Sequence, residues 1–455
     1  MKQIITAKLK LETTPEQFTQ LRQTQLAYRD ALNYVSHYAF DSGKTSSFQR
    51  LQRGMYREIR GRFALPSEMT NNVLKQVAAT YKSLWTKAKR NAEHRRKKWT
   101  KRRFKGLDEP PKYTSPSVTY DYGYDYTFKK GQRVSIRAMQ KRVVLLYTGY
   151  EKHLALIRSG AKIGTGKLCC DSSHKQFYLL VSLELELTDP APETQHDILG
   201  VDVGARYLAT EATLTGKSRF FSGKYVRARA DHYSRLQKRL QRKGTRSAKR
   251  RMNALRGRER RLKLNTNHII AKTIVQAHPH TLIGLEELTY IRERTPRRMH
   301  RHKGKKSLGI SPKERRANRH ASHWAFAELQ GAICYKAALS CSVAIKVDAD
   351  YTSQACPLCG YADRRNRPGR GLLFVCRNPE CPYKLRTGHS YMLHADLVGA
   401  RNIAMRTLLI RQDWMRTGYL SVTPGFQDPD VSDDKAKAAR LTRYAELRWS
   451  PDTSL

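Results

Sequence analysis

The sequence predicts a multidomain α/β protein, with a small antiparallel β-barrel interrupted by helices and then a larger α/β domain that contains a cysteine module. Three observations support this fold class. Residues 1–190 combine strand-like alternation with two long helical patterns. Residues 198–203 and 281–285 are short apolar runs with carboxylates inside or just after them, and four cysteines in paired spacing follow. A chain of 455 residues has room for two or three domains.

The first part is expected to be a barrel with a helical insertion. Residues 2–11 alternate like a strand, and Thr14 followed by Pro15 predicts a helix that runs to about Phe40. A second helix is predicted at residues 68–94, and further strands at residues 134–136, 142–147, 167–170 and 177–185. We therefore assign residues 1–12 and 112–190 to the barrel and residues 13–111 to the helical insertion.

Two groups of side chains in this part are candidate nucleic-acid contacts. Asn72, Lys75 and Gln76 are polar positions in an otherwise apolar helix, and they could contact base edges or phosphates. Ordinary solvent-facing positions are the alternative. A group of tyrosines could stack on unpaired bases, with barrel wall and rim as the alternative. These tyrosines are Tyr113, Tyr120, Tyr122, Tyr124 and Tyr126.

Three acidic residues are the candidate catalytic groups. Asp202 lies inside the apolar run of residues 198–203, a predicted central strand where a lone carboxylate is costly to bury unless it is paired or metal-bound. Glu286 follows the apolar run of residues 281–285, and Asp396 opens a predicted helix. Carboxylates from two strands and a helix could converge at one edge of a sheet, where hard oxygen ligands suit Mg²⁺ or Mn²⁺. The alternative is three structural roles: a buried acid, a strand end and a helix cap.

Four cysteines form the second candidate metal site. Cys356 and Cys359 have the spacing C-x2-C, and Cys376 and Cys381 have the spacing C-x4-C. This pattern predicts a tetrahedral zinc site that is closed by four thiolates and is therefore structural. A disulfide pair is the alternative, which we disfavour because we see no secretory signal and expect a cytoplasmic, nucleoid-associated prokaryotic protein. The remaining cysteines lie in apolar surroundings and are expected in cores. They are Cys169, Cys170, Cys334 and Cys341.

Charge predicts the partner. The chain has 87 Lys and Arg against 39 Asp and Glu, a formal net charge of +48. The basic residues cluster at residues 87–105, at residues 235–263 in a predicted helical hairpin that turns near Gly244, and at residues 294–306. Three such runs favour nucleic acid, bound tightly and with a steep salt dependence. A membrane is disfavoured because no long apolar segment is present. Residues 412–455 lose periodicity and are expected to be a flexible tail that is mostly disordered or loosely docked.

The ordered motifs resemble those of TnpB, a family of transposon-encoded RNA-guided nucleases ancestral to type V CRISPR effectors. The resemblance is carried by GVDVGARYLA, GLEEL, HWAFAELQGAICYKA, YTSQACPLCG with CRNPEC, and HADLVGARNIA. It implies a wedge domain for the barrel, a recognition domain for the inserted helices, and an RNase H-like RuvC nuclease domain at residues 196–349 and 386–411. A zinc-finger insertion for target nucleic acid would occupy residues 350–385.

The resemblance also implies an activity and its residues. The protein would bind a guide RNA, read a short motif beside the DNA target and cut double-stranded DNA, with Asp202, Glu286 and Asp396 as magnesium ligands. We expect a monomer with its RNA. The chain departs from the family pattern at Val398, where Asn is common, and at His394 and Glu287. A guide-directed regulator without cleavage, a type V CRISPR effector and a nuclease that needs no guide are the alternatives.

Overall fold

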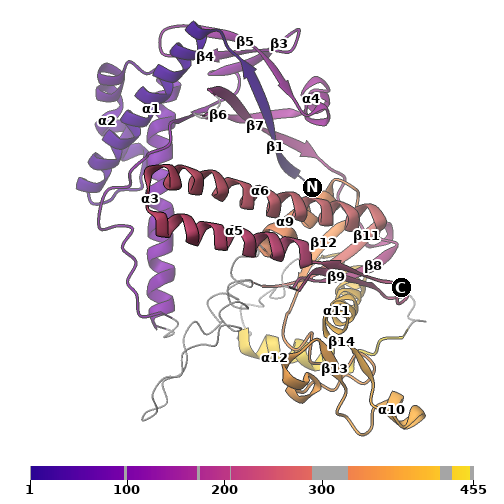
Figure 1. Ribbon diagram of the computed structural model, residues 1–455. Coiled ribbons are helices and arrows are strands. Elements are labelled where there is room, and N and C mark those ends of the chain that lie inside the picture. The colour runs from indigo at the N-terminus through magenta and orange to yellow at the C-terminus, as the bar shows by residue number, and fades with distance from the viewer. Residues whose placement is uncertain are drawn as a thin grey trace, which may run out of the picture. The chain divides into compact units, whose positions relative to one another are not determined.

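The computed structural model describes residues 2–96, 100–171, 175–204, 206–288, 326–420 and 433–450. The chain divides into two compact units, residues 2–186 and residues 187–455, drawn in Figure 1. Each has its own hydrophobic core. The boundary between the units lies at residues 186–187.

The N-terminal unit contains a seven-stranded antiparallel sheet in the order β2-β6-β7-β1-β5-β4-β3. Its edge strands β2 and β3 are consecutive in the chain, and the Tyr126 N–H donates to the Asp121 carbonyl between them. The sheet is therefore a nearly closed barrel, which confirms the predicted barrel. Its elements are β1 (Lys2–Glu12), β2 (Ser117–Tyr120), β3 (Tyr126–Lys129), β4 (Arg133–Arg137), β5 (Arg142–Gly149), α4 (Glu151–Arg158), β6 (Lys162–Asp171) and β7 (Gln176–Glu186).

Three helices are inserted between β1 and β2: α1 (Pro15–Asp41), α2 (Phe48–Phe63) and α3 (Ser67–Arg96). The predicted start of α1 is confirmed, because Thr14 and Gln17 form a reciprocal capping box. The sequence analysis did not predict α2. Only Leu51, Met55 and Ile59 are buried along it, and the Arg and Gln residues between them obscure that apolar stripe.

A buried carboxylate in this unit gives the barrel a pH-dependent stability. Asp125 accepts hydrogen bonds from the Asp121 N–H and the Asn72 amide, and burial raises the pKa of Asp125 to about 6. The folded barrel then binds a proton more tightly than the unfolded chain, so the barrel should lose stability as pH rises from about 4 to 6. Hydrogen exchange of residues 117–149, corrected for intrinsic rates, should show less protection at pH 7 than at pH 5.

The matched variant is Asp125→Asn, which cannot ionise but keeps an oxygen that can accept from the Asp121 N–H. We expect protection in this variant to be independent of pH over the same range. An unchanged pH dependence in the variant would mean that a different group is responsible.

The C-terminal unit is built on a five-stranded mixed sheet in the order β10-β9-β8-β11-β12. β8, β11 and β12 run parallel, and β9 is antiparallel to β8. Residues of α6 and α9 form one core with the first face of the sheet, and residues of α11 form another core with the second face. The strands are β8 (Asp197–Asp202), β9 (Tyr207–Thr213), β10 (Ser218–Ser222), β11 (Thr281–Glu286) and β12 (Val343–Val347), after a short turn η1 (Pro192–Thr194).

The basic hairpin predicted at residues 235–263 is confirmed. It consists of α5 (Lys224–Lys243) and α6 (Arg246–Ala277), which lie side by side in Figure 1 and share a small core. Gly244 ends α5 with a φ of 65°, the left-handed conformation that glycine adopts most easily. The third basic cluster, residues 294–306, lies outside the described residues. Most of the motif HWAFAELQGAICYKA lies in the helix α9 (Phe326–Ala338).

The cysteine module follows β12 and contains η2 (Arg364–Asn366), η3 (Pro368–Arg370), β13 (Leu373–Val375), α10 (Pro382–Thr387) and β14 (Met392–His394). The long helix α11 (Ala395–Thr417) comes next, and α12 (Asp433–Glu446) comes last. The expectation of a flexible tail from residue 412 was therefore wrong for residues 412–417, which continue α11, and for residues 433–450. Residues 433–450 dock through charge and aromatic contacts that involve Arg440, Tyr444 and Trp449, which apolar periodicity does not report.

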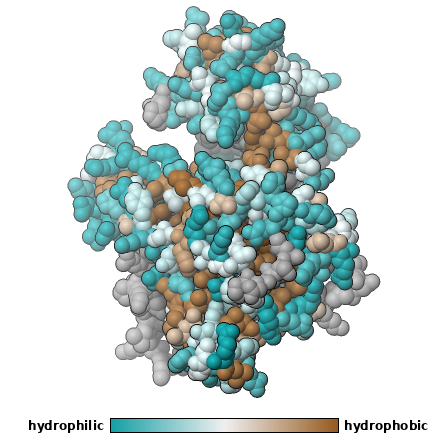
Figure 2. Space-filling model, turned by 90° about the vertical axis from the view of Figure 1, so that its right-hand side faces the viewer, coloured by the Kyte–Doolittle hydropathy of each residue, from teal (hydrophilic) through white to brown (hydrophobic). Residues whose placement is uncertain are grey.

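Among the helices that the structure describes, none is both long enough and apolar enough to cross a lipid bilayer. Figure 2 shows hydrophilic side chains over most of the face that it draws.

Candidate active site and cysteine module

Two of the predicted acids lie next to each other at the end of the C-terminal sheet. β8 and β11 are parallel neighbours, and Leu285 pairs with Val201. Asp202 and Glu286 are the next residues on each strand, so they occupy adjacent C-terminal strand ends, where neighbouring backbones are about 4.8 Å apart. Glu287 follows outside the sheet, and its carboxylate pairs with Lys346 at 3.2 Å.

The third acid is brought to this edge by the close packing of α11 on the sheet. Gly200 and Gly284 are register partners on β8 and β11. A Cβ atom at Gly200 would clash with the Ala400 carbonyl of α11, and one at Gly284 would clash with the Thr407 hydroxyl. The two glycines therefore let the helix backbone approach the strands. Asp396, in the first turn of α11, is consequently held beside the ends of both strands.

Replacing Gly200 with Ala should lower the stability of the C-terminal unit, because the new methyl group meets backbone atoms of α11 that cannot move independently. Overpacking of this kind costs about 1–3 kcal/mol or more, so we expect a lower Tm in thermal unfolding. Gly331→Ala is the matched control, since a Cβ atom there meets nothing within 4 Å and alanine favours helix. Equal Tm values for the two variants would contradict the packing argument.

The pKa values of the three acids are raised by burial, and those of Asp202 and Glu286 also by the negative charges of the neighbouring acids. Burial raises the pKa of Asp202 well above its ordinary value, and the charges of Glu286 and Asp396 raise it further. Burial also raises the pKa of Glu286 and of Asp396. One buried and two half-buried carboxylates that repel each other cost free energy, and a bound cation would recover part of that cost.

Several neighbours hold these carboxylates. The Thr352 hydroxyl donates to Glu286 Oε1, and the Gln330 amide donates to the Glu286 carbonyl at 2.8 Å. Two arginines offset part of the rise in these pKa values. The positive charge of Arg406 acts on Glu286, and the charge of Arg367 acts on both Asp202 and Asp396. The sequence patterns do not predict roles for Thr352, Arg367 and Arg406. Thr352 lies inside the quoted motif YTSQACPLCG, whereas Arg367 and Arg406 lie outside the quoted motifs.

Two departures from the family pattern have structural explanations. Val398 is fully buried in the core of the cysteine module, beside Cys356, Phe374 and Tyr391. It therefore supports packing on that side of α11. His394 caps α11, and its Nδ1 accepts a hydrogen bond from the Asp396 N–H at 3.3 Å, so Asp396 has backbone support from its own helix start.

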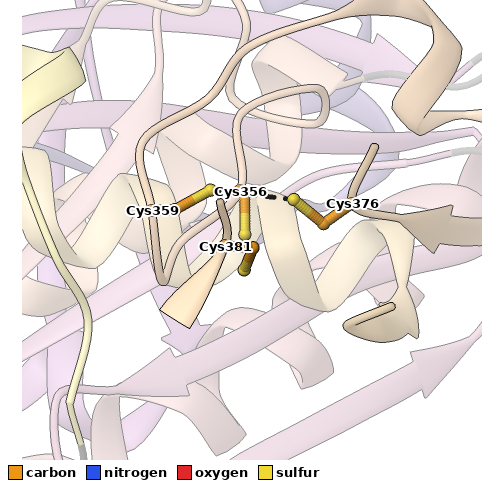
Figure 3. Close-up of side chains that lie close together, drawn as sticks. All are labelled: Cys356, Cys359, Cys376 and Cys381. Carbon is orange, nitrogen blue, oxygen red and sulfur yellow. Dashed lines mark hydrogen bonds between the residues drawn. The ribbon is translucent and has the colours of Figure 1, made fainter. Parts of the chain in front are cut away.

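The four predicted cysteines converge, as Figure 3 shows. Their sulfur atoms all lie within 4.8 Å of one another, and Cys359 Sγ lies 3.7 Å from Cys376 Sγ. A disulfide would need about 2.05 Å. Tetrahedral Zn²⁺ with Zn–S bonds of about 2.3 Å places its sulfurs about 3.8 Å apart, so the thiols fit a zinc ion and do not fit a disulfide. Over the described ranges, this is the one group of three or more His, Cys, Asp or Glu ligands so closely spaced, and the acid triad is wider.

The core prediction for the other cysteines is confirmed in part. Cys170 and Cys334 are half-buried and pack against the hydrophobic cores. Cys169 is half-buried, and the prediction was wrong for Cys341, which is exposed. Cys341 follows the last turn of α9 with a φ of 54°, so it belongs to the turn before β12.

The candidate nucleic-acid contacts in the N-terminal unit differ in how exposed their side chains are to solvent. Asn72 is only 4% exposed, and its amide donates to the Thr119 carbonyl and to Asp125, so it is used within the fold. Lys75 is exposed but pairs with Glu68 at 3.0 Å and Asp121 at 3.5 Å. Gln76 is half-buried and accepts from the Tyr28 hydroxyl.

The candidate tyrosines also differ in solvent exposure. Tyr120 and Tyr126 are fully buried, which fits the barrel-wall alternative. Tyr113 donates its hydroxyl to Thr80 at 2.8 Å. Tyr122 is 38% exposed and Tyr124 is 77% exposed, so these two remain available for stacking on a base.

Two family models match the C-terminal unit. Residues 179–291, which include Asp202 and Glu286, match the family OrfB_IS605, described as probable transposase. Residues 326–403, which include the four cysteines and Asp396, match the family described as Cas12f1-like, TNB domain. The two matches occur in the order that the motifs predict. Together the two matches support a TnpB-like family for this chain.

Individual relatives cover the chain unevenly. This chain is 39% identical over 88 residues to the CRISPR-associated endodeoxyribonuclease Cas12f1 of Sulfoacidibacillus thermotolerans. That alignment covers 19% of this chain and 18% of the relative, so the chain matches less than a fifth of the curated relative's length.

Two solved structures resemble larger parts of the chain. The mini-RNA-guided endonuclease CRISPR-Cas_phi3 aligns over 90% of this chain and 92% of its own, with 11% identity and a TM-score of 0.47. Cas12f1 in a complex with sgRNA and target DNA aligns over 88% of this chain and 99% of its own, with 15% identity and a TM-score of 0.34. At TM-scores below 0.5 these superpositions are too loose to assign a fold.

Proposed function

We propose that this protein is an RNA-guided DNA endonuclease that binds a transposon-derived guide RNA, recognises a short motif beside its target and cleaves double-stranded DNA. The observation that carries the proposal is the arrangement of Asp202, Glu286 and Asp396 at one sheet edge, next to the four-cysteine module. Within the family, residues 196–349 and 386–411 would form an RNase H-like RuvC domain. Residues 350–385 would form the zinc-finger insertion, 1–12 and 112–190 the wedge domain, and 13–111 the recognition domain.

The acids would hold Mg²⁺ or Mn²⁺. Such ions, when bound, supply an activated water and charge stabilisation for hydrolysis of a phosphodiester. The carboxylates converge from rigid strand ends and a helix start, so little reorganisation would be needed to close their spacing around a cation. Thr352 and the His394 cap would keep Glu286 and the backbone of Asp396 in place during this closure. Zn²⁺ would hold the four cysteines in a purely structural role.

Arg367 is the proposed phosphate-binding residue of this site. Its Nη1 donates to the Ser353 hydroxyl at 2.9 Å, and its guanidinium acts electrostatically on Asp202 and Asp396. Its Nε is buried without a hydrogen-bond partner in the structure. An arginine held at the acids by the cysteine module would position the scissile phosphate and balance its negative charge.

Guide RNA would occupy the basic surfaces, above all the α5–α6 hairpin. Its exposed face carries a dense set of arginines and lysines with few acids. Contacts to the RNA backbone would make binding strongly salt-dependent. In the N-terminal unit, Lys75, Gln76, Tyr122 and Tyr124 remain proposed contacts to nucleic acid. Asn72 is withdrawn from that set because its amide is satisfied inside the fold.

The proposal is tested by purifying the protein from cells that carry its native flanking locus and sequencing the RNA that remains bound. One discrete RNA, together with Mg²⁺-dependent cleavage of a plasmid that matches its guide segment, is expected. A discrete RNA with matched binding but no cleavage would indicate a guide-directed regulator. Cleavage without a defined RNA, and indifferent to sequence, would indicate a nuclease that needs no guide.

A further inference from the structure

The described C-terminal segment, residues 433–450, contacts the loop that follows β12 and carries Asp348. We call residues 433–450 the C-terminal strap and residues 348–352 the β12 loop. Arg440 Nε of the strap lies 2.8 Å from Asp348 Oδ2, and the Tyr444 hydroxyl donates to the same oxygen at 3.0 Å. Asp348 is almost buried, so these two strap residues satisfy a carboxylate that would otherwise be costly. Figure 1 draws the helix of the strap, α12, in yellow.

Tyr444 of the strap also contacts Arg406 of α11. The guanidinium of Arg406 lies over the Tyr444 ring, 4.2 Å from its centroid. Arg406 also donates hydrogen bonds to the Asp348 carbonyl and, at 2.7 Å, to the Asp350 carbonyl. Tyr444 thus fixes the arginine that holds the backbone of the β12 loop.

The last residue of the β12 loop contacts Glu286. Thr352, the last residue of the loop, donates its hydroxyl to Glu286 Oε1. The Thr352 carbonyl accepts from the Asn402 amide of α11 at 2.6 Å. A continuous set of contacts therefore runs from Arg440 and Tyr444, through Asp348 and Arg406, to the carboxylate of Glu286.

The end of the strap is attached to the first cysteine knuckle. The backbone N–H of Trp449 donates to the Pro357 carbonyl at 2.7 Å, and the Arg401 guanidinium lies 3.7 Å from the centroid of the Trp449 ring. Gly360, with a φ of 72°, lies so close to the Ala445 carbonyl that a side chain there would clash. The strap therefore spans from the β12 loop to the cysteine module and restrains both.

We propose that the C-terminal strap is a positioning device for the active site, with Arg440 and Tyr444 as positioning residues that hold Glu286 through the β12 loop. The proposal rests on the proposed nuclease function. Without the two strap residues, Asp348 would lose its cationic and hydroxyl partners, and Arg406 would lose the ring that orients it. The β12 loop would then hold Thr352, and hence the Glu286 carboxylate, less firmly.

The test uses the full-length chain with its guide RNA and four variants. Arg440→Ala/Tyr444→Ala removes the attachment. Arg440→Lys and Tyr444→Phe are conservative versions, because lysine keeps a cation at Asp348 and phenylalanine keeps the ring under Arg406. Thr442→Ala is the matched control, since Thr442 is exposed and its hydroxyl bonds only to the Ala438 carbonyl of the same helix. Single-turnover cleavage is measured at saturating RNA and matched DNA, as a function of Mg²⁺ concentration.

We expect the double variant to cleave about 10–100-fold more slowly, the scale found for residues that support metal ligands, and to need more Mg²⁺ for half its maximal rate. Its affinity for guide RNA should equal that of the wild type. Each conservative variant should lose less than about tenfold, the scale of one hydrogen bond, and Thr442→Ala should lose nothing. An unchanged rate and Mg²⁺ dependence in the double variant would overturn the proposal. So would a loss that only follows reduced RNA binding or a lower Tm.

Hydrogen exchange separates this proposal from the nuclease function. In the double variant, residues 281–288 and the β12 loop should lose protection while α5 and α6 keep theirs. If the wild type cuts no matched DNA, the nuclease function fails, and the exchange result still reports whether the strap positions Glu286. If exchange at residues 281–288 is unaffected, the strap proposal fails even where the wild type is an active nuclease.

Discussion

Replacing Asp202 with Asn is expected to reduce cleavage of matched DNA by about 10³-fold or more, the scale on which loss of one member of a catalytic group acts. The amide keeps the shape of the side chain but cannot supply the negative charge that a metal ion needs. The charges of both Glu286 and Asp396 act on Asp202. Loss of the Asp202 carboxylate would therefore remove the ligand that is close to both other acids. Binding of guide RNA and of target DNA should be unchanged.

Asp197→Asn is the control for this experiment, because Asp197 begins the same strand, β8, at the edge of the sheet opposite to Asp202. Its carboxylate accepts a hydrogen bond from the neighbouring Ile198 N–H, which an amide oxygen can also accept. The control should cleave like the wild type. Full cleavage by Asp202→Asn would show that the three acids are structural and that catalysis occurs elsewhere.

The second large effect is expected from the cysteine module. We expect one zinc ion per chain by elemental analysis, and its loss in Cys381→Ser. Binding of structural zinc contributes about 10–16 kcal/mol in small modules, so its loss should disorder the module. The core around Cys356, Phe374 and Tyr391 would open. Arg367 would then no longer be held near the acids, and cleavage should fall about 100-fold or more.

Cys341→Ser is the matched control, because Cys341 is exposed and lies outside the four-cysteine group. It should keep both zinc and cleavage activity. Limited proteolysis of Cys381→Ser should show new cuts within residues 350–394, while β8 and β11 stay protected. A Cys381→Ser protein that retains stoichiometric zinc and full cleavage would contradict a structural zinc role.

Much of the C-terminal sheet was predictable because its strands are short apolar runs with turn residues at their ends. The apolar runs before Asp202 and Glu286, and the paired spacing of the cysteines, are local patterns. The role of Gly200 and Gly284 could not be predicted from the sequence, because it depends on their pairing in the sheet. They are register partners, and together they admit α11 and with it Asp396.

The supporting residues could not be predicted, because their roles depend on contacts between distant segments. Thr352 reaches Glu286 across 66 residues of chain, and Tyr444 reaches Asp348 across 96. Neither contact leaves a periodic pattern. The sequence predicts a flexible tail in place of the strap for the same reason, because the attachment of the strap depends on Arg440, Tyr444 and Trp449 and not on an apolar face. Asn72 looks like a surface polar residue in sequence, yet it is buried against Asp125.

The central claim is that a bound RNA chooses where this protein cuts. The most direct measurement reconstitutes the protein with guide RNAs whose target segment is rewritten, and maps the ends of plasmids that carry both the original and the rewritten target. Cleavage that moves to each rewritten target, requires Mg²⁺ and is absent in Asp202→Asn is the predicted result. Cleavage that stays at one site, or spreads over both targets whatever the guide, would contradict the claim.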